Sequence, residues 1–436
     1  MSKKVPKPHL SMWTSASFIV ASMIGTGVFT SLGYQLLEIN TIFPLLLLWL
    51  IGGIIAFCGA LTYGELATTY PRSGGEYSLL STILHPSLGF GAGLVSATIG
   101  FAAPGVLAAI ALGSYLSIFF QNIEPSLFAI LIISFIHIIH VKSIKLGTSF
   151  QNISTLIKII FILVFIAFGL NIENPQSLTL LPVEGDMDVI FDAPFAVSLV
   201  WVSYAYTGWN TVIYVAGEVK NPIQNITKSM LVSTSIVMIL YLLLNFTFLF
   251  TTPLMTLQGE VEVALISGIE IFGVNGGKVI SLSISLLLLS TISSYIYIGP
   301  RVLAIMGEDY KELNFFNKKN IEGIPVNAFI LQFFLSIIFI LTSSFEQVLI
   351  YTSICLIIIS SLTVFSLFFS RFKEKDLSRP YRAFGYPLTP LIYLMLNFWI
   401  LFYSFIHSRF ESFIGVCIFL FSIIIYFFFK KVEHNG

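Results

Sequence analysis

Long apolar runs dominate this chain and decide what it can fold into. Each run covers roughly 20 residues, the length that an α-helix needs to cross the hydrocarbon core of a bilayer. Over the whole chain 56% of the residues are hydrophobic and only 10% are charged, whereas soluble domains carry about 25% charged residues. Because helices satisfy their own backbone hydrogen bonds, as lipid requires, the sequence predicts an all-α integral membrane protein.

Twelve membrane-spanning helices are expected, within a single polytopic domain that covers residues 1–436. The third and the eighth are long enough to tilt or to project from the bilayer. The twelve expected ranges are near 12–37, 41–64, 88–120, 125–141, 151–170, 190–216, 229–251, 277–306, 326–343, 347–370, 387–407 and 411–429.

Basic residues fall almost entirely on one side of these spans. If the N-terminus is cytoplasmic, all of the 22 Lys and Arg residues except Lys158, Lys278 and Arg409 belong to cytoplasmic segments. The acidic loops 171–192 and 256–276 then lie outside. The positive-inside rule therefore predicts a multi-pass protein of the plasma membrane with both termini in the cytoplasm. The cytoplasmic basic residues are Lys3, Lys4, Lys7, Arg72, Lys142, Lys145, Lys220, Lys228, Arg301, Lys311, Lys318, Lys319, Arg371, Lys373, Lys375, Arg379, Arg382, Lys430 and Lys431.

Two spans contain short sequences that do not favour a helix. Residues 24–28 read IGTGV in the first span, and residues 203–210 read SYAYTGWN in the sixth. In lipid, irregular backbone survives only where it lines a cavity or is buried in protein, so both stretches are candidates for unwinding. The alternative is that their glycines allow neighbouring helices to pack closely, as small residues often do in membranes.

The positions of the two stretches favour unwinding. With five spans in each repeat, the first and sixth spans are equivalent, and an odd number of spans inverts the second copy. Corresponding breaks in two inverted halves are typical of the binding site of a secondary transporter. We therefore expect a five-plus-five inverted repeat, with one copy at about 12–170, the other at about 190–370, and additional helices at about 387–429.

Four stretches carry a resemblance to a known family. In order along the chain, between residue 15 and about residue 390, they read SASFIVASMIGTGVF, YGELATTYPRSGGEYSLL, SYAYTGWNTVIYVAGEVKNP and RPYRAFGYPLTP. They resemble the amino acid–polyamine–organocation (APC) transporters, most of all the L-type amino acid transporter branch and its bacterial relatives. The resemblance implies a LeuT-type fold with broken helices 1 and 6 and a mechanism of alternating access.

The first break offers groups that suit a carboxylate. Unwinding at Ile24, Gly25, Thr26 and Gly27 exposes backbone N–H groups, and the half-helix that follows directs its positive end at them. The Thr26 hydroxyl can add a donor or bond its own backbone. In the family, the corresponding residues bind the α-carboxylate of an amino acid.

The second break offers groups that suit an ammonium ion. Carbonyl groups near Tyr204 and Ala205 become free on unwinding, and Gly208 lets the backbone approach a substrate closely. In the family this break binds the α-amino group. The two breaks together therefore predict an amino acid as substrate.

Four side chains are further candidates for the pocket. Tyr204, Trp209 and Asn210 lie in the middle of the sixth span, where a role in the hydrophobic core is as reasonable as a role in a site. The resemblance favours Tyr204 as the aromatic ring that closes over the substrate, and Trp209 and Asn210 match a Trp-Asn pair of L-type relatives. Tyr295 in the eighth span is a weaker candidate, placed in the pocket only by counting residues back along the sequence from Arg301 and Asp309.

The substrate is expected to be a neutral amino acid. A cationic side chain in a dry pocket needs a carboxylate, and no Asp or Glu lies in the middle of an expected span. A cationic amino acid or a polyamine is the alternative. Glu65, Arg72 and Glu218 lie at cytoplasmic ends of spans or in loops, where composition indicates an interfacial role and the resemblance implies a cytoplasmic gate.

Lys158 is the one ionisable residue expected deep inside a span. It lies about 10 Å beyond Gln151 along the expected fifth helix. Either it extends its long side chain to the interface, or it has a function, since charges inside the membrane are costly. The resemblance implies that its ammonium group lies beside the first break, where sodium-coupled members hold a cation, and hence that transport is sodium-independent, by exchange or proton symport.

The chain lacks the motifs that other classes of membrane protein require. An intramembrane enzyme needs paired catalytic residues or a metal motif at membrane depth, and an ATP-driven pump needs a phosphate-binding loop. A channel remains compatible with the composition, but channels rarely need two broken helices. We expect no enzymatic activity, no cofactor or metal and no nucleic acid partner.

The cysteines bear on a possible partner subunit. Cys58, Cys355 and Cys417 all lie in expected spans. In the eukaryotic exchangers of the family, a cysteine between spans three and four joins the transporter to a glycoprotein, but here that loop reads QNIEP at residues 121–125. The sequence therefore predicts a stand-alone prokaryotic transporter without a disulfide-linked ancillary subunit.

Overall fold

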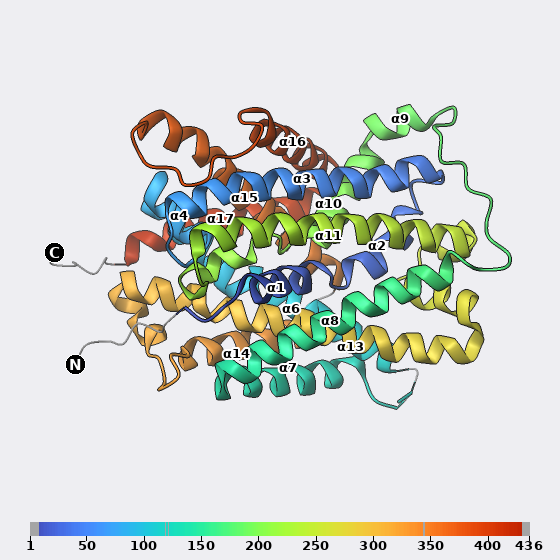
Figure 1. Ribbon diagram of the computed structural model, residues 1–436, viewed down its shortest axis with the longest axis horizontal. Helices are drawn as coiled ribbons and strands as arrows, with labels where there is room; N and C mark the ends of the chain where they lie inside the picture. Colours follow the sequence, from blue (N-terminus) through green and yellow to red (C-terminus); the bar gives the residue numbers. More distant parts are fainter. Residues whose placement is uncertain (1–7, 118, 121, 343–344, 430–436) are drawn as a thin grey trace.

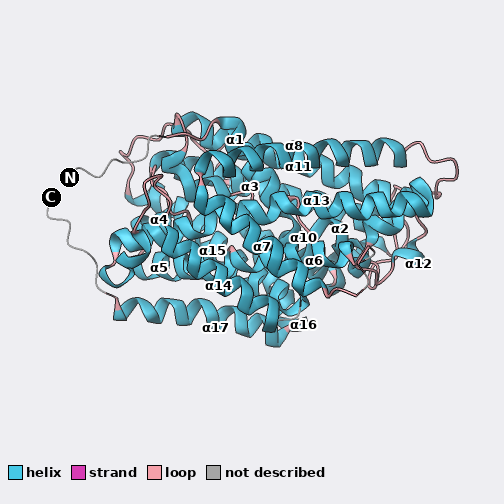
Figure 2. Ribbon diagram, turned by 90° about the horizontal axis from the view of Figure 1, so that it is seen from below, coloured by secondary structure: helices cyan, strands magenta, loops and turns pink. Residues whose placement is uncertain are grey.

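The computed structural model describes residues 8–117, 119–120, 122–342 and 345–429. In this part of the chain the structure is helical, with no β-strand and only an isolated bridge between Leu10 and Val219 (Figure 2). Most of the helices run along the long axis of the molecule (Figure 1). The expected basic residues at positions 3, 4, 7, 430 and 431 and the last residue of the expected ninth span, 343, lie outside the described residues.

The helices follow the expected order. They are α1 (Met12–Met23), α2 (Gly27–Gln35), α3 (Ile42–Thr69), α4 (Glu76–Ile83), α5 (Pro86–Val95), a π-helical turn (Ser96–Gly100), α6 (Ala102–Leu116), α7 (Pro125–Lys142), α8 (Ile144–Gly169), α9 (Asp186–Phe191), α10 (Ala193–Tyr206), a 3-10 segment (Thr211–Glu218), α11 (Pro222–Thr251), α12 (Leu254–Leu257), α13 (Val263–Asp309), a 3-10 segment (Lys311–Asn317), α14 (Val326–Thr342), α15 (Phe345–Lys373), α16 (Leu388–His407), α17 (Arg409–Ile425) and a 3-10 turn (Tyr426–Phe428).

Ten helical stretches among the described residues are long and apolar enough to cross a membrane. The expected ninth span is the shorter apolar helix α14. The expected sixth span is divided between α10 and the 3-10 segment Thr211–Glu218. The membrane class and the all-helical fold are confirmed, and twelve crossings stay a prediction.

Three helices begin well before their expected starts, and one of them is α11, which begins at Pro222, seven residues before residue 229. Helix α8 begins at Ile144, seven residues before the expected start, because the extended residue Ser143 separates it from α7. Helix α13 extends from Val263 to Asp309 and includes a non-helical residue, Gly273, with φ of 74°. Its first turns therefore occupy part of the segment that the sequence predicts as an outer loop.

The broken helices lie at the centre of the molecule. The stretch from Met12 to Gln35 is almost completely buried, whereas α16 and α17 are mostly exposed. Helix α1 packs against α8, α11 and α13, and α10 packs against α2, α3 and α16. Both breaks are thus enclosed by protein on all sides, as irregular backbone in a membrane must be.

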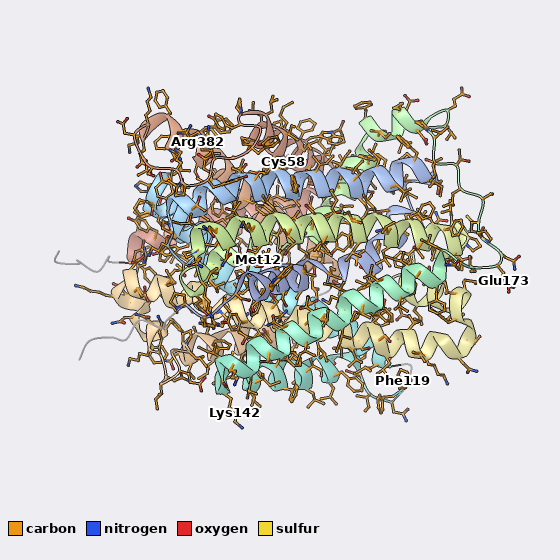
Figure 3. The ribbon with its side chains drawn as sticks, in the orientation of Figure 1. Met12, Cys58, Phe119, Lys142, Glu173 and Arg382 are labelled. Carbon is orange, nitrogen blue, oxygen red and sulfur yellow. The ribbon has the colours of Figure 1, made fainter. Side chains whose placement is uncertain are left out.

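The first and last described residues lie at the same end of the molecule (Figure 1). Phe429 packs against Phe90 and Tyr310, near the C-terminal end of α13. Lys142 and Arg382 lie towards this end, and Glu173 lies at the opposite end (Figure 3). The end that faces the cytoplasm stays a prediction from the distribution of basic residues.

Candidate functional site

The first break separates α1 from α2. Ile24 leaves the helical region with φ of −78° and ψ of 84°, and the Gly25 N–H turns back to the Met23 carbonyl at 2.9 Å. The hydrogen bonds among the described residues include none from the N–H groups of Thr26 and Gly27. These groups lie at the N-terminal end of α2, where unpaired donors and the helix dipole suit an anion.

The Thr26 side chain is buried beside the second break. Its hydroxyl lies near the Tyr204 phenol but has no hydrogen-bond partner of acceptable geometry within the described chain. A buried hydroxyl normally finds a partner. The group is therefore available to a ligand at this position.

The second break brings its glycine directly against the first. Gly208 has φ of 110°, and a Cβ atom on it would lie 2.5 Å from the Cβ of Ser22. A Cβ atom on Gly27 would lie 2.7 Å from the Cα of Ala205. The two interpretations of the sequence are therefore not exclusive, because the same glycines permit unwinding and close packing.

Tyr241 of α11 links the two breaks, and sequence reasoning missed it. Its hydroxyl lies 2.5 Å from the Met23 carbonyl and 2.8 Å from the Ala205 carbonyl. A hydroxyl has one proton to donate, so the two carbonyls share it. The Ala205 carbonyl keeps acceptor capacity for an ammonium group, and the Tyr204 carbonyl, which accepts from the Thr207 N–H at 2.9 Å, likewise has a second lone pair.

Lys158 is directed into the protein, not towards an interface. Since α8 begins at Ile144, Lys158 lies 14 residues along the helix, or about 21 Å, and its side chain is 0% exposed. Its ammonium group donates to the Ile24 carbonyl and to the Thr291 hydroxyl, the latter at 2.7 Å. Thr291 also donates to the Ile24 carbonyl at 2.8 Å. A carbonyl released by the first break is therefore satisfied by a lysine and a threonine.

Two cavities adjoin the breaks. The smaller, of about 10 Å³, is lined by Ser22, Met23, Gly25, Thr26, Gly27, Pro104, Tyr204, Ala205, Thr291 and Tyr295. The larger, of about 70 Å³, includes Gly208, Trp209 and Asn210 in its wall. Tyr295 lines both cavities, and its hydroxyl donates to the Ser22 carbonyl at 2.9 Å. All predicted pocket residues except Ile24 thus line one of the two cavities.

Glu76 lines the larger cavity, and sequence reasoning did not select it. It is the first residue of α4 and follows Gly74 and Gly75, whose φ values are 112° and 61°. This turn directs the carboxylate inwards, where it accepts hydrogen bonds from Tyr63 at 3.0 Å and Asn210 at 2.5 Å. No expected span includes Glu76, so the absence of Asp and Glu from the middle of the spans does not exclude a carboxylate at this cavity.

The three predicted gate residues do not form one cluster. Glu65 is fully buried and binds Arg371 of α15 through two hydrogen bonds of 2.9 and 2.5 Å. Arg72 is half-exposed and pairs with Asp309 at the end of α13, at 2.7 Å.

Glu218 joins the second break to α13 and to the start of the described chain. It pairs with Arg301 at 2.6 Å and accepts from the Tyr297 hydroxyl at 2.8 Å, and His9 lies 3.5 Å away. Burial raises the pKa of Glu218, but Arg301 and His9 outweigh this effect and hold the pKa below its ordinary value. These contacts hold the second break against α13 and against the first described residues.

Comparison with known proteins identifies the family. The family model described as "Amino acid permease" matches residues 10–434. The chain belongs to this family. It is therefore an amino acid transporter of the APC family in a membrane, not an enzyme.

Curated relatives cover nearly the whole chain. The Serine/threonine exchanger SteT of Bacillus subtilis is 26% identical over 98% of this chain and 97% of its own length. The mouse b(0,+)-type amino acid transporter 1 is 25% identical over 96% of this chain and 87% of its own length. The mouse Large neutral amino acids transporter small subunit 2 is 24% identical, with coverage of 97% and 81%.

Proposed function

We propose that this APC transporter is a sodium-independent permease for neutral amino acids. It works by alternating access, as an exchanger or a proton symporter, in the plasma membrane of a prokaryote with both termini in the cytoplasm. It acts as a stand-alone chain without a disulfide-linked subunit. Its helices form two inverted repeats of five spans, with α16 and α17 as additions.

The observation that carries the proposal is the contact between the two breaks. Thr26 and Gly27, whose N–H groups are free, line the same cavity as Tyr204 and Ala205, whose carbonyls keep acceptor capacity. An amino acid has an anionic and a cationic group a few ångströms apart, and these two sets of donors and acceptors match them. The Thr26 hydroxyl supplies a further donor for the carboxylate.

Lys158 supports independence from sodium. Its amino group already donates to the Ile24 carbonyl that the first break releases, so a sodium ion would have to displace the lysine from this acceptor. The lysine therefore takes the structural part that a sodium ion would otherwise have.

A neutral substrate is supported by the names of two relatives, one a serine/threonine exchanger and the other a transporter of large neutral amino acids. A cationic amino acid is the second candidate, because Glu76 lines the larger cavity together with the aromatic rings of Trp209, Tyr214 and Tyr393. A carboxylate and aromatic faces both attract cations.

An exchange assay tests the proposal. The purified protein is placed in liposomes, and each batch is preloaded with one of the twenty amino acids. Uptake of the same amino acid, added outside in labelled form, is then measured. We expect accelerated uptake of neutral amino acids and weak competition by lysine and arginine. Uptake of lysine and arginine alone would favour the second candidate, and no uptake of any amino acid would contradict both.

A further inference from the structure

Glu76 has no cationic partner among the described residues, unlike Glu65 and Glu218. Glu65 pairs with Arg371 at 2.5 Å, and Glu218 pairs with Arg301 at 2.6 Å. Glu76 is only 2% exposed and takes part in none of the ion pairs that the described chain forms. Since buried charges are normally paired, Glu76 needs a positive partner from outside the fold.

The side chains that face Glu76 across the cavity are neutral. Tyr63 of α3, and Asn210 and Tyr214 of the second break, donate hydrogen bonds to its carboxylate. Tyr393 of α16 lies across the same cavity. Phenols have an ordinary pKa of about 10 and carry no positive charge at any pH. These groups orient the carboxylate but do not neutralise it.

The remaining neighbours offer no cation either. Helices α5 and α15 pack against α4, but among the described residues α5 contributes nothing to the cavity wall, and α15 contributes Ser353, Leu356, Ile357 and Ser360. The arginine that comes closest in sequence, Arg72, is paired with Asp309. Only a proton or a cationic ligand can compensate the charge.

A neutral amino acid does not provide this charge. Its carboxylate and ammonium groups are matched by the first and second breaks, so the cavity would close over an uncompensated Glu76. Burial raises the pKa of Glu76 to about 7, although hydrogen bonds from Tyr63 and Asn210 act in the opposite direction. Both protonation states are therefore accessible near neutral pH, with the protonated form favoured below about pH 7.

We propose that Glu76 binds one proton when a neutral amino acid occupies the site and that this proton crosses the membrane with the substrate. This proposal rests on the proposed function, and within it chooses proton symport over exchange alone. The proton adds to a carboxylate oxygen on the side of entry and leaves the same oxygen on the other side, so that no bond in the substrate changes.

The geometry links protonation to movement of the second break. Asn210 and Tyr214 belong to this break, whereas Glu76 is anchored on α4 and Tyr63 on α3. Hydrogen bonds to a charged acceptor are stronger than those to a neutral one. Protonation therefore weakens the connection between the broken segment and its neighbours, which allows the segment to move when the site is occupied.

The test measures proton movement with substrate movement. Liposomes that contain the purified wild type and a trapped pH-sensitive dye receive an inward gradient of L-serine, or of L-leucine if the exchange assay selects it. We expect internal acidification with net uptake, and faster uptake at external pH 6 than at pH 8, on either side of the pKa of about 7. In Glu76→Gln the side chain is permanently neutral. Any uptake that this variant retains should therefore be independent of pH and should move no protons.

Tyr63→Phe provides a second variant if Glu76→Gln does not fold. It removes one donor to the carboxylate, and the pH midpoint of uptake should rise by about one unit. An unmoved midpoint would contradict the proposal. Net uptake by the wild type without proton movement would also contradict the proposal. A selective loss of lysine and arginine uptake in Glu76→Gln would contradict it too, because Glu76 would then bind the cationic side chain of a substrate. A wild type that transports no amino acid at all would instead contradict the proposed function.

Discussion

The Tyr241 hydroxyl joins the two breaks, and its removal tests whether they act as one site. In Tyr241→Phe the ring keeps its contacts with Trp49 and Tyr206, so the core is preserved. The carbonyls of Met23 and Ala205, at 2.5 and 2.8 Å, lose the donor that they share. The variant therefore changes the hydrogen bonding of the breaks and little else.

The expected effect follows from this geometry. A hydroxyl donates one proton at a time, so the variant loses the equivalent of one hydrogen bond, about 1 kcal/mol. The buried Ala205 carbonyl is also left without a donor, which costs at least about 1 kcal/mol more. A total of about 2 kcal/mol lowers the population of the arrangement in which the breaks touch by about 30-fold.

Equilibrium binding and exchange in liposomes measure this effect. We expect the affinity of Tyr241→Phe for its amino acid to fall by at least tenfold, with a matching loss of exchange at low substrate concentration. Tyr115→Phe is the control, because its hydroxyl is equally buried and has no hydrogen-bond partner among the described residues. If Tyr241→Phe binds as tightly as Tyr115→Phe, the two breaks do not form one binding site.

Three further predictions concern other parts of the account. Lys158→Ala leaves the carbonyls of the first break without their cation and should abolish exchange in liposomes; normal exchange would make the lysine dispensable. Gly208→Ala should lower the melting temperature in detergent more than Gly185→Ala, since both glycines have positive φ but only Gly208 would clash; equal melting temperatures would contradict the tight packing of the breaks. In a chain without other reactive cysteines, Glu173→Cys should react with an impermeant reagent from outside, and Lys318→Cys only after permeabilisation; the reverse would invert the orientation.

The sequence predicts the breaks well because lipid leaves few options for glycine-rich backbone inside a span. Gly25, Gly27 and Gly208 occur where a helix is otherwise expected, and the structure unwinds both places. The sequence also identifies Lys158 as a candidate functional residue, since a charged residue so deep in the membrane is costly. Its burial could not be predicted, because the start of α8 at Ile144 depends on the turn at Ser143 and not on hydrophobicity.

The residues that sequence reasoning missed act through partners far along the chain. Tyr241 and Met23 are 218 residues apart, and apolar periodicity indicates which face of α11 is buried but not which carbonyl its tyrosine meets. Glu76 lies outside every expected span and enters the cavity only because the turn at Gly74 and Gly75 leads the chain back into the protein. Two glycines followed by an acidic residue, next to a membrane span, therefore indicate a carboxylate that can turn back into the protein.

Replacement of sodium tests the central claim most directly, which is that a lysine, and not a bound cation, completes the site between the breaks. Exchange by the wild type in liposomes is measured in sodium chloride and in choline chloride of equal concentration. We predict the same rate in both salts, because the ammonium group of Lys158 already occupies the Ile24 carbonyl. Strict dependence on sodium would contradict the account.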